Sequence, residues 1–344
     1  MSALPRIAVF ALGGTIASSS DEGEGAIVRI SGGELLEHVP QAAAIADVEV
    51  HSVRMVPSGD LTLRDVLELR VLIEASLDSG VAGVVVTQGT DTLEETSYAT
   101  ELLTTSDAPI VFTGAMRTSS APGSDGPANL LAAVRVAASP SARQLGTVVV
   151  FNDEIHAARH VRKRHTSSPA TFGSELAGPL GFVSEDRVRV LLRPNGRLHV
   201  QVDAAAPDVR VAQIPVFFGS DARLIEAVPS LGYKGLVVAA FGGGHVPSWL
   251  VPSLEAVAEH VPVIVASRTN GGEGLRHTYA YSGSELDLLS RGLVSAVSLD
   301  TAHATVLLRL LLMAGVDRSA LGQCFEQASD PHGLITVPVP SHAP

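Results

Sequence analysis

The chain has 344 residues, of which 46 % are hydrophobic and 17 % are charged, and its formal net charge is −12 at pH 7. This length and apolar content predict a folded protein of two domains and exclude a largely disordered chain. The negative charge argues against nucleic acid or an anionic membrane as a partner, because both attract a basic surface.

Short apolar runs rich in β-branched residues alternate with helix-like stretches in the first part of the chain. Strands are expected at 7–12, 81–87, 109–114 and 146–152. Helices are expected at 61–80 and 126–138. Continuous apolar strands that alternate with helices predict a parallel sheet covered on both faces.

This rhythm changes after residue 152, where a long polar segment begins. Short strands are expected at 187–192 and 197–202, and residues 202–208 have the composition of a linker. A second α/β series follows, with strands at 210–218, 235–241 and 262–267 and a helix at about 301–313. The expected fold class is therefore α/β with two domains. The larger N-terminal domain (1–203) has a mostly parallel sheet flanked by helices, and the smaller C-terminal α/β domain (209–344) also has a parallel sheet.

The first strand also bears on where the protein resides. Its apolar run from Ile7 to Leu12 is shorter than a secretory segment, and only Arg6 precedes it as a cation. No stretch of the sequence is long enough to span a bilayer. We therefore expect a buried strand here, a cytoplasmic protein and no membrane partner.

Two of the expected strands end in glycine followed by threonine. Residues 13–15 read Gly-Gly-Thr, and residues 89–91 read Gly-Thr-Asp. Ligands bind beyond the carboxyl ends of parallel strands, and glycine lets the backbone turn sharply there. Thr15 and Thr90 are thus candidates for one crevice, where a threonine nucleophile needs a partner that takes its proton. Each motif alone also suits an ordinary strand end or helix start.

Lysine is rare in this chain. Of 24 cationic side chains only Lys163 and Lys234 are lysine. Lys163 lies between Arg162 and Arg164, where a solvated run of charge is the simpler interpretation. Arginine stays protonated, whereas a buried lysine can release a proton, so Lys163 is also a candidate for proton transfer.

The sequence contains no convincing cofactor motif. The single cysteine, Cys324, excludes a disulfide within the chain and is expected to be a core residue of a helix. The histidines His156, His160 and His165 have no carboxylate at metal spacing and favour structural roles. The glycines at 242–244 lack the spacing of a dinucleotide site. We expect neither a metal nor an organic cofactor.

Taken together, these motifs resemble the bacterial-type L-asparaginase family, which is related to the glutaminase-asparaginases. The resemblance covers nearly the whole chain. The matching segments are ALGGTIA (11–17), TQGTDTLEETSY (87–98), VFTGAMR (111–117), SDGPANL (124–130), VVVFND (148–153), VRKRHTSSPATFGS (161–174) and AGPLGF (177–182). Two threonine motifs, the GAMR strand and the lysine segment in this order are a highly specific combination.

The resemblance implies a role for each of the four reactive side chains. Thr15 is the implied nucleophile that attacks the side-chain amide carbon of L-asparagine. Thr90, Asp91 and Lys163 are the implied second catalytic set, in which Lys163 tunes the Thr90 hydroxyl. The implied reaction forms an acyl-enzyme and yields L-aspartate and ammonia.

The resemblance also implies a set of substrate contacts. Ser58 would hold the α-carboxylate and Asp91 the ammonium group. Backbone groups around Thr90 and Ala115 would position the amide and stabilise the oxyanion. Glu285, from the smaller domain of a neighbouring subunit, would complete the site, so the resemblance implies a homo-oligomer, dimer or tetramer, with sites at subunit interfaces.

The sequence departs from the family pattern at three places. The loop after the first threonine (18–33) lacks the family's tyrosine, because the first tyrosine is Tyr98. Residue 59 is Gly59 where secreted members have a glutamine that touches the substrate, and Gly243 stands where those members have an asparagine. These departures leave open the affinity and the preference between asparagine and glutamine.

The sequence leaves three alternatives open. The first is a glutaminase-asparaginase of relaxed specificity, and the second is a catalytically weak homologue that senses or binds an amino acid. The third is the asparaginase-like subunit of a tRNA-dependent amidotransferase. That subunit needs a tRNA-binding partner and usually an added N-terminal module, whereas only six residues precede the first expected strand and the chain is acidic.

Overall fold

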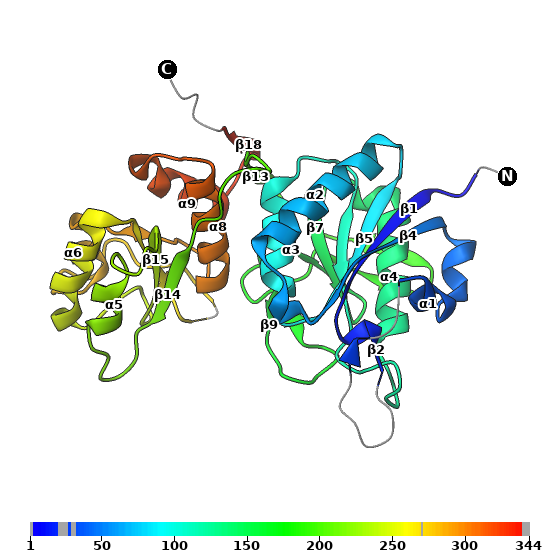
Figure 1. Cartoon of the computed structure of the whole chain (residues 1–344), viewed down its shortest axis with the longest axis horizontal. Coiled ribbons are helices and arrows are strands. Elements are labelled where there is room, and N and C mark those ends of the chain that lie inside the picture. The colour runs from blue at the N-terminus through cyan, green and yellow to red at the C-terminus, as the bar shows by residue number, and fades with distance from the viewer. Residues whose placement is uncertain (1–2, 20–26, 29–31, 270, 339–344) are drawn as a thin grey trace. The chain divides into compact units, whose positions relative to one another are not determined.

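The computed structural model describes residues 3–19, 27–28, 32–269 and 271–338. Internal contacts divide the chain into two units, Met1–Pro194 and Asn195–Pro344, and Figure 1 shows the elements of each. The division lies before the predicted boundary at 203 because β13 (Gly196–Val200) pairs with β18 (Gly333–Val337) in the second unit. The predicted fold class is confirmed: both units are α/β.

An eight-stranded sheet is the centre of the first unit, in the order β12-β11-β8-β7-β6-β5-β1-β4. The pairings from β7 through β6, β5 and β1 to β4 are parallel, and those from β7 through β8 and β11 to β12 are antiparallel. The strands are β1 (Arg6–Gly13), β4 (Asp47–Val56), β5 (Gly83–Thr87), β6 (Ile110–Thr113), β7 (Thr147–Phe151), β8 (Glu154–Ala157), β11 (Gly181–Ser184) and β12 (Arg187–Val190). The short pairs are β2 (Ser18–Ser19) with β3 (Ile27–Val28) and β9 (Arg162–Lys163) with β10 (Phe172–Gly173).

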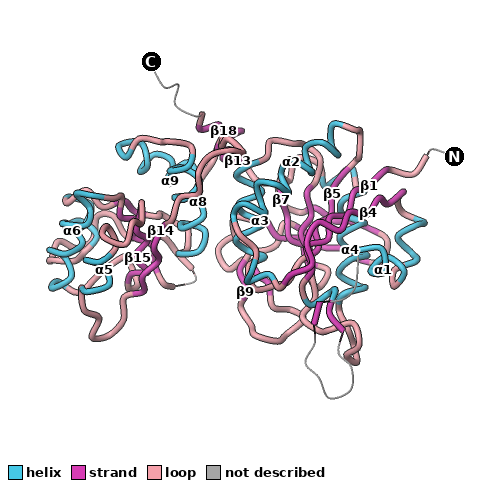
Figure 2. Tube along the Cα trace, in the orientation of Figure 1, coloured by secondary structure: helices cyan, strands magenta, loops and turns pink. Residues whose placement is uncertain are grey.

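Helices pack on both faces of this sheet (Figure 2). They are α1 (Gly32–Glu37), α2 (Leu63–Asp78), α3 (Leu93–Leu103) and α4 (Gly126–Ala138). Successive side chains of a strand point to opposite faces. Accordingly, Ile7 and Val9 of β1 belong to the core under α4, whereas Ala8 and Phe10 belong to the core under α2 and α3. This explains why the central strands read as continuous apolar runs.

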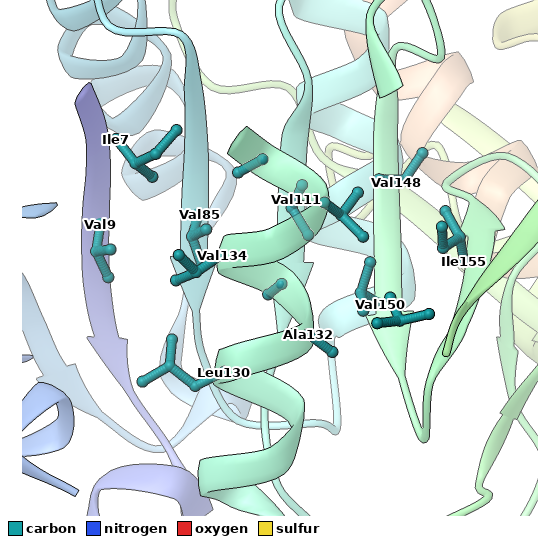
Figure 3. Close-up of a cluster of buried hydrophobic side chains, with 14 of the residues drawn as sticks. Ile7, Val9, Val85, Val111, Leu130, Ala132, Val134, Val148, Val150 and Ile155 are labelled. Carbon is teal, nitrogen blue, oxygen red and sulfur yellow. The ribbon is translucent and has the colours of Figure 1, made fainter. Parts of the chain in front are cut away.

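The core under α4 consists mainly of aliphatic side chains (Figure 3). Leu130 and Val134 of the helix pack with Val85, Val111 and other valines of the central strands. Burying one such side chain contributes about 1.5–3 kcal/mol, so this cluster stabilises the packing of α4 on the strands.

The second unit contains a parallel sheet in the order β14-β15-β16-β17. Its strands are β14 (Val211–Pro215), β15 (Gly235–Ala240), β16 (Val263–Ser267) and β17 (Val294–Ser295). Its helices are α5 (Arg223–Ala227), α6 (Val251–His260), α7 (Glu285–Ser290), α8 (Thr301–Met313) and α9 (Leu321–Ser329). Aliphatic residues of the sheet and of α6 form its core.

Cys324 lies on α9 and is only 5 % exposed, so its prediction as a helical core residue is confirmed. Burial raises the pKa of its thiol, which disfavours the reactive thiolate. Within the described parts of the chain, the helices are too short or too polar to cross a bilayer.

Candidate active site

A cavity of about 460 Å³ opens where β1 and β5 end at the carboxyl edge of the first sheet. Its wall includes Thr15, Thr90, Asp91 and Ser58, four of the residues singled out in the sequence. The other lining residues are Gly14, Ser18, Met55, Pro57, Gly89 and Thr118. The structure therefore brings the two threonines to one cavity.

Contact between two glycine backbones sets the distance between the threonine-bearing turns. Gly14 has φ 85° and ψ −170°, a conformation open almost only to glycine. A Cβ on Gly14 would lie 2.0 Å from the Gly89 nitrogen. A Cβ on Gly89 would lie 2.7 Å from the Ser58 hydroxyl. Glycine at both positions is thus what allows the two turns to pack this closely.

Gly14→Ala is accordingly expected to destabilise the protein by about 3 kcal/mol or more, because the added Cβ is both strained and in collision. Gly59→Ala is the matched control. A Cβ at Gly59 would meet no atom within 4 Å, so stability should change by less than about 0.5 kcal/mol. Urea unfolding of both variants measures the difference, and equal midpoints would contradict the backbone argument.

Lys163 reaches the second threonine turn from β9. Its Nζ donates to Thr90 Oγ1 at 2.9 Å and to Asp91 Oδ1 at 2.6 Å. The Lys163 side chain is 20 % exposed and that of Asp91 is 75 % exposed. The ammonium group is therefore shared between a hydroxyl in the cavity wall and a carboxylate that faces solvent.

Ser58 joins the same turn from the end of β4. It is 2 % exposed. Its hydroxyl accepts a hydrogen bond from the Asp91 N–H at 3.1 Å, and its carbonyl accepts one from the Thr92 hydroxyl at 2.9 Å. Because the oxygen of the hydroxyl is used as an acceptor, its proton can be donated to a ligand in the cavity.

Ala115 is not among the residues that line the cavity. It is fully buried. The loop after it is held by Asp125, whose carboxylate accepts the N–H groups of Met116 and Arg117 at about 3 Å. Asn129 donates to the Gly114 carbonyl at 3.0 Å. The predicted part of Ala115 in substrate binding therefore stays a prediction.

Glu285 lies in the second unit, at the start of α7, and is 3 % exposed. The N–H groups of Thr278 and Tyr279 donate to its Oε1 at 2.7 and 2.6 Å. Its Oε2 lies 2.9 Å from His245 Nε2, and His245 Nδ1 is 2.9 Å from the Tyr281 hydroxyl. Burial by itself would raise the pKa of Glu285, but these hydrogen bonds lower it overall, so a negative charge is held inside the unit.

Comparison with known proteins places the chain in a family. Residues 6–195 match the family described as asparaginase, N-terminal, and residues 210–325 match the glutaminase/asparaginase C-terminal domain. The chain belongs to the asparaginase family.

Relatives of this asparaginase-family protein occur in bacteria and yeast. It is 34 % identical to an L-asparaginase of Bacillus licheniformis, over 89 % of this chain and 95 % of the relative. It is 37 % identical to probable L-asparaginase 4 of Schizosaccharomyces pombe, over 78 % of each chain. It is 32 % identical to L-asparaginase 2 of Escherichia coli, over 94 % of each chain.

His156 and His165 of this asparaginase-family chain have local partners. His156 is 1 % exposed and its Nδ1 lies 3.0 Å from the Ser174 hydroxyl. His165 Nδ1 accepts the N–H groups of Ser167 and Ser168, each at 3.0 Å. In the portion of the chain that the structure describes, no three side chains of the metal-binding types form a cluster that could hold an ion.

His156 makes the stability of the fold depend on pH. Burial, and to a lesser degree the nearby charge of Arg164, lowers its pKa from 6.5 to about 4. The Glu154 carboxylate, 3.2 Å from Nε2, opposes this shift, but it is half exposed and solvent screens its charge. Between pH 6.5 and 4 the unfolded histidine binds a proton that the folded one does not, so stability falls as pH falls through this window.

We therefore expect the asparaginase-family chain to lose about 2 kcal/mol of unfolding free energy from this group between pH 7 and pH 5. Urea unfolding at the two values measures the loss. His156→Gln removes the titrating group, so the variant should lose about 2 kcal/mol less unfolding free energy than the wild type between the two pH values. Equal losses in the two proteins would show that His156 is not the cause.

Inspection of the sequence missed several residues at or near these sites. Thr118 lines the cavity but lies outside the quoted motifs. Glu94 lies within the motif at 87–98 but was given no role, yet its carboxylate contacts the Lys163 backbone. His245 lies beside Glu285, although the two are distant in sequence and nothing local pointed to their contact.

Proposed function

We propose that this chain hydrolyses the side-chain amide of L-asparagine to L-aspartate and ammonia. The observation that carries the proposal is that Thr15 and Thr90 line one cavity, with the Lys163 ammonium 2.9 Å from the Thr90 hydroxyl. Membership of the asparaginase family supports the same reaction.

In the proposed mechanism the Thr15 oxygen attacks the amide carbon, and the amide nitrogen leaves with the hydroxyl proton as ammonia. Water then cleaves the resulting ester, which releases aspartate and restores the hydroxyl. Thr90, Asp91 and Lys163 form the proton-handling set, because their hydroxyl, carboxylate and ammonium are already joined by hydrogen bonds. The reaction as proposed needs neither a metal nor an organic cofactor.

The remaining assignments concern substrate binding. Ser58 can donate its proton to the α-carboxylate, and Asp91, being largely exposed, can accept the ammonium group. Gly59 follows Ser58 and is not among the lining residues; because a Cβ there would meet no atom within 4 Å, we assign it a contact with substrate through its backbone alone. Backbone groups around Thr90 and Ala115 would position the amide and the oxyanion.

We further propose that Glu285 acts on a site in a neighbouring copy, in a dimer or tetramer. Among the described residues, the N–H groups of Thr278 and Tyr279 donate to its Oε1, and His245 contacts its Oε2. A carboxylate oxygen has room for two hydrogen bonds. In this proposal Oε2 is the oxygen that would accept an additional hydrogen bond from an ammonium group.

Mixed oligomers test the shared site. Thr15→Ala and Glu285→Gln, each impaired alone, should regain activity when co-expressed, because some sites then combine an intact Thr15 with an intact Glu285. Light scattering measures the oligomeric state. If the two variants form a mixed oligomer but activity does not recover, the shared site is ruled out.

An ammonia assay with asparagine, glutamine and D-asparagine tests the function itself. We expect release from L-asparagine to be fastest. A glutaminase-asparaginase of relaxed specificity is the alternative, because the one additional methylene of glutamine changes the free energy of binding by only about 1–3 kcal/mol. Equal rates of ammonia release from asparagine and glutamine would favour it. Calorimetry that detects bound asparagine or aspartate without turnover would favour an amino-acid-binding homologue.

Residence in the cytoplasm is part of this proposal. The apolar run from Ile7 to Leu12 is used as the buried strand β1. One relative, from Haemophilus influenzae, is named a probable periplasmic L-asparaginase, so the periplasm is the alternative compartment. Cell fractionation with an antibody to this chain would decide between the two compartments.

A further inference from the structure

The strand that carries Lys163 is held from two sides. On one side, the Arg164 N–H donates to the Thr171 carbonyl at 2.7 Å, toward β10. Successive N–H groups of a strand point in opposite directions, so the Lys163 N–H points away from β10. On that second side the acceptor is the side chain of Glu94.

The contact with Glu94 is short and largely buried. Glu94 Oε2 accepts the Lys163 N–H at 2.5 Å and lies 3.6 Å from the Nε of Arg162. The Glu94 side chain is 13 % exposed and that of Arg162 is 22 % exposed. A carboxylate that accepts a backbone N–H makes a charge-assisted bond, stronger than one between neutral groups. Glu94 thus fastens the backbone of β9 to helix α3.

Glu94 and the partners of the lysine side chain come from one helix start. Thr90 and Asp91 lie just before α3, and Glu94 lies in its first turn. Lys163 contacts this rigid segment twice, through its N–H and through its Nζ. Because a lysine side chain is flexible, the reach of the ammonium group depends on where its backbone is held.

We propose that Glu94 is a positioning residue, which holds the Lys163 backbone so that the ammonium group stays within hydrogen-bond distance of Thr90. The catalytic consequence rests on the proposed amide hydrolysis. Misplacing a catalytic group by about 1 Å can lower a rate by about 10²-fold.

The first test compares Glu94→Ala with Glu94→Gln in the ammonia assay. Alanine removes the acceptor and should lower kcat by about 10- to 100-fold, with KM within about threefold. Glutamine keeps an acceptor oxygen and should restore kcat to within about threefold of wild type. Glu175→Ala is the matched control: Glu175 pairs with Arg164 in the same segment, 3.0 Å apart, without contacting the Lys163 N–H, and its loss should leave kcat unchanged.

A double-mutant cycle then asks whether Glu94 acts through Lys163. In a Lys163→Ala background, Glu94→Ala should cause no further loss, because the group that it positions is gone. An equal loss in both backgrounds, or wild-type kcat in Glu94→Ala, would overturn the inference.

Hydrogen exchange provides a readout that is independent of activity. The Lys163 amide should exchange at least about tenfold faster in Glu94→Ala than in wild type, and glutamine should restore part of the protection. Unchanged exchange would overturn the inference. A wild-type protein that releases no ammonia would instead contradict the proposed function and leave the exchange test of Glu94 valid.

Discussion

Replacing Thr15 by alanine is expected to lower kcat for ammonia release from L-asparagine by at least roughly 10³-fold. The reason is that the acyl-enzyme cannot form without the hydroxyl. Thr15 is only partly buried at the edge of the cavity, so the thermal unfolding midpoint should stay within a few degrees of wild type.

Thr118→Ala is the matched control for this experiment. Thr118 lines the same cavity but has no proposed chemical role, so its loss should change kcat by less than about threefold. Thr15→Ser should keep measurable activity, and mass spectrometry of the wild-type protein mixed rapidly with asparagine should detect the aspartyl ester. Near-normal ammonia release from Thr15→Ala would assign the nucleophile to another residue.

Lys163→Arg is expected to lower kcat by about 100-fold although it preserves the positive charge. Lys163 Nζ fits between Thr90 Oγ1 and Asp91 Oδ1, at 2.9 and 2.6 Å. A guanidinium group is larger, and it does not release its proton in proteins. It can therefore replace the charge but not the proton transfer.

Lys234→Arg is the control that the sequence itself offers, because Lys234 is the other lysine of the chain. It lies on the exposed surface of the second unit, and the substitution should leave kcat unchanged. A fully active Lys163→Arg variant would remove the argument for proton transfer and reduce Lys163 to a source of charge.

Several elements could be predicted because their signals are local. The helix predicted at 126–138 is α4 (Gly126–Ala138), and the one predicted at about 301–313 is α8 (Thr301–Met313). A helix that packs one side against a core carries apolar residues at helical spacing, and this spacing can be recognised in the sequence. The glycines before Thr15 and Thr90 likewise marked the strand ends that line the cavity.

Other features depend on contacts between distant parts of the chain. The sequence did not reveal that β13 pairs with β18, and the predicted boundary at 203 differs from the division at Pro194 for that reason. Residues 197–202 carry the pattern of a strand, but this pattern does not determine which other strand it pairs with.

The sequence by itself determined the α/β class, the strand ends that carry Thr15 and Thr90, and the unusual lysine at position 163. Only the tertiary structure decided that Glu94 holds the Lys163 backbone and that Glu285 is already bonded within its own unit. The physical reason is that apolar periodicity and turn chemistry act between neighbours in sequence. Hydrogen bonds of side chains depend instead on which strands and helices pack together.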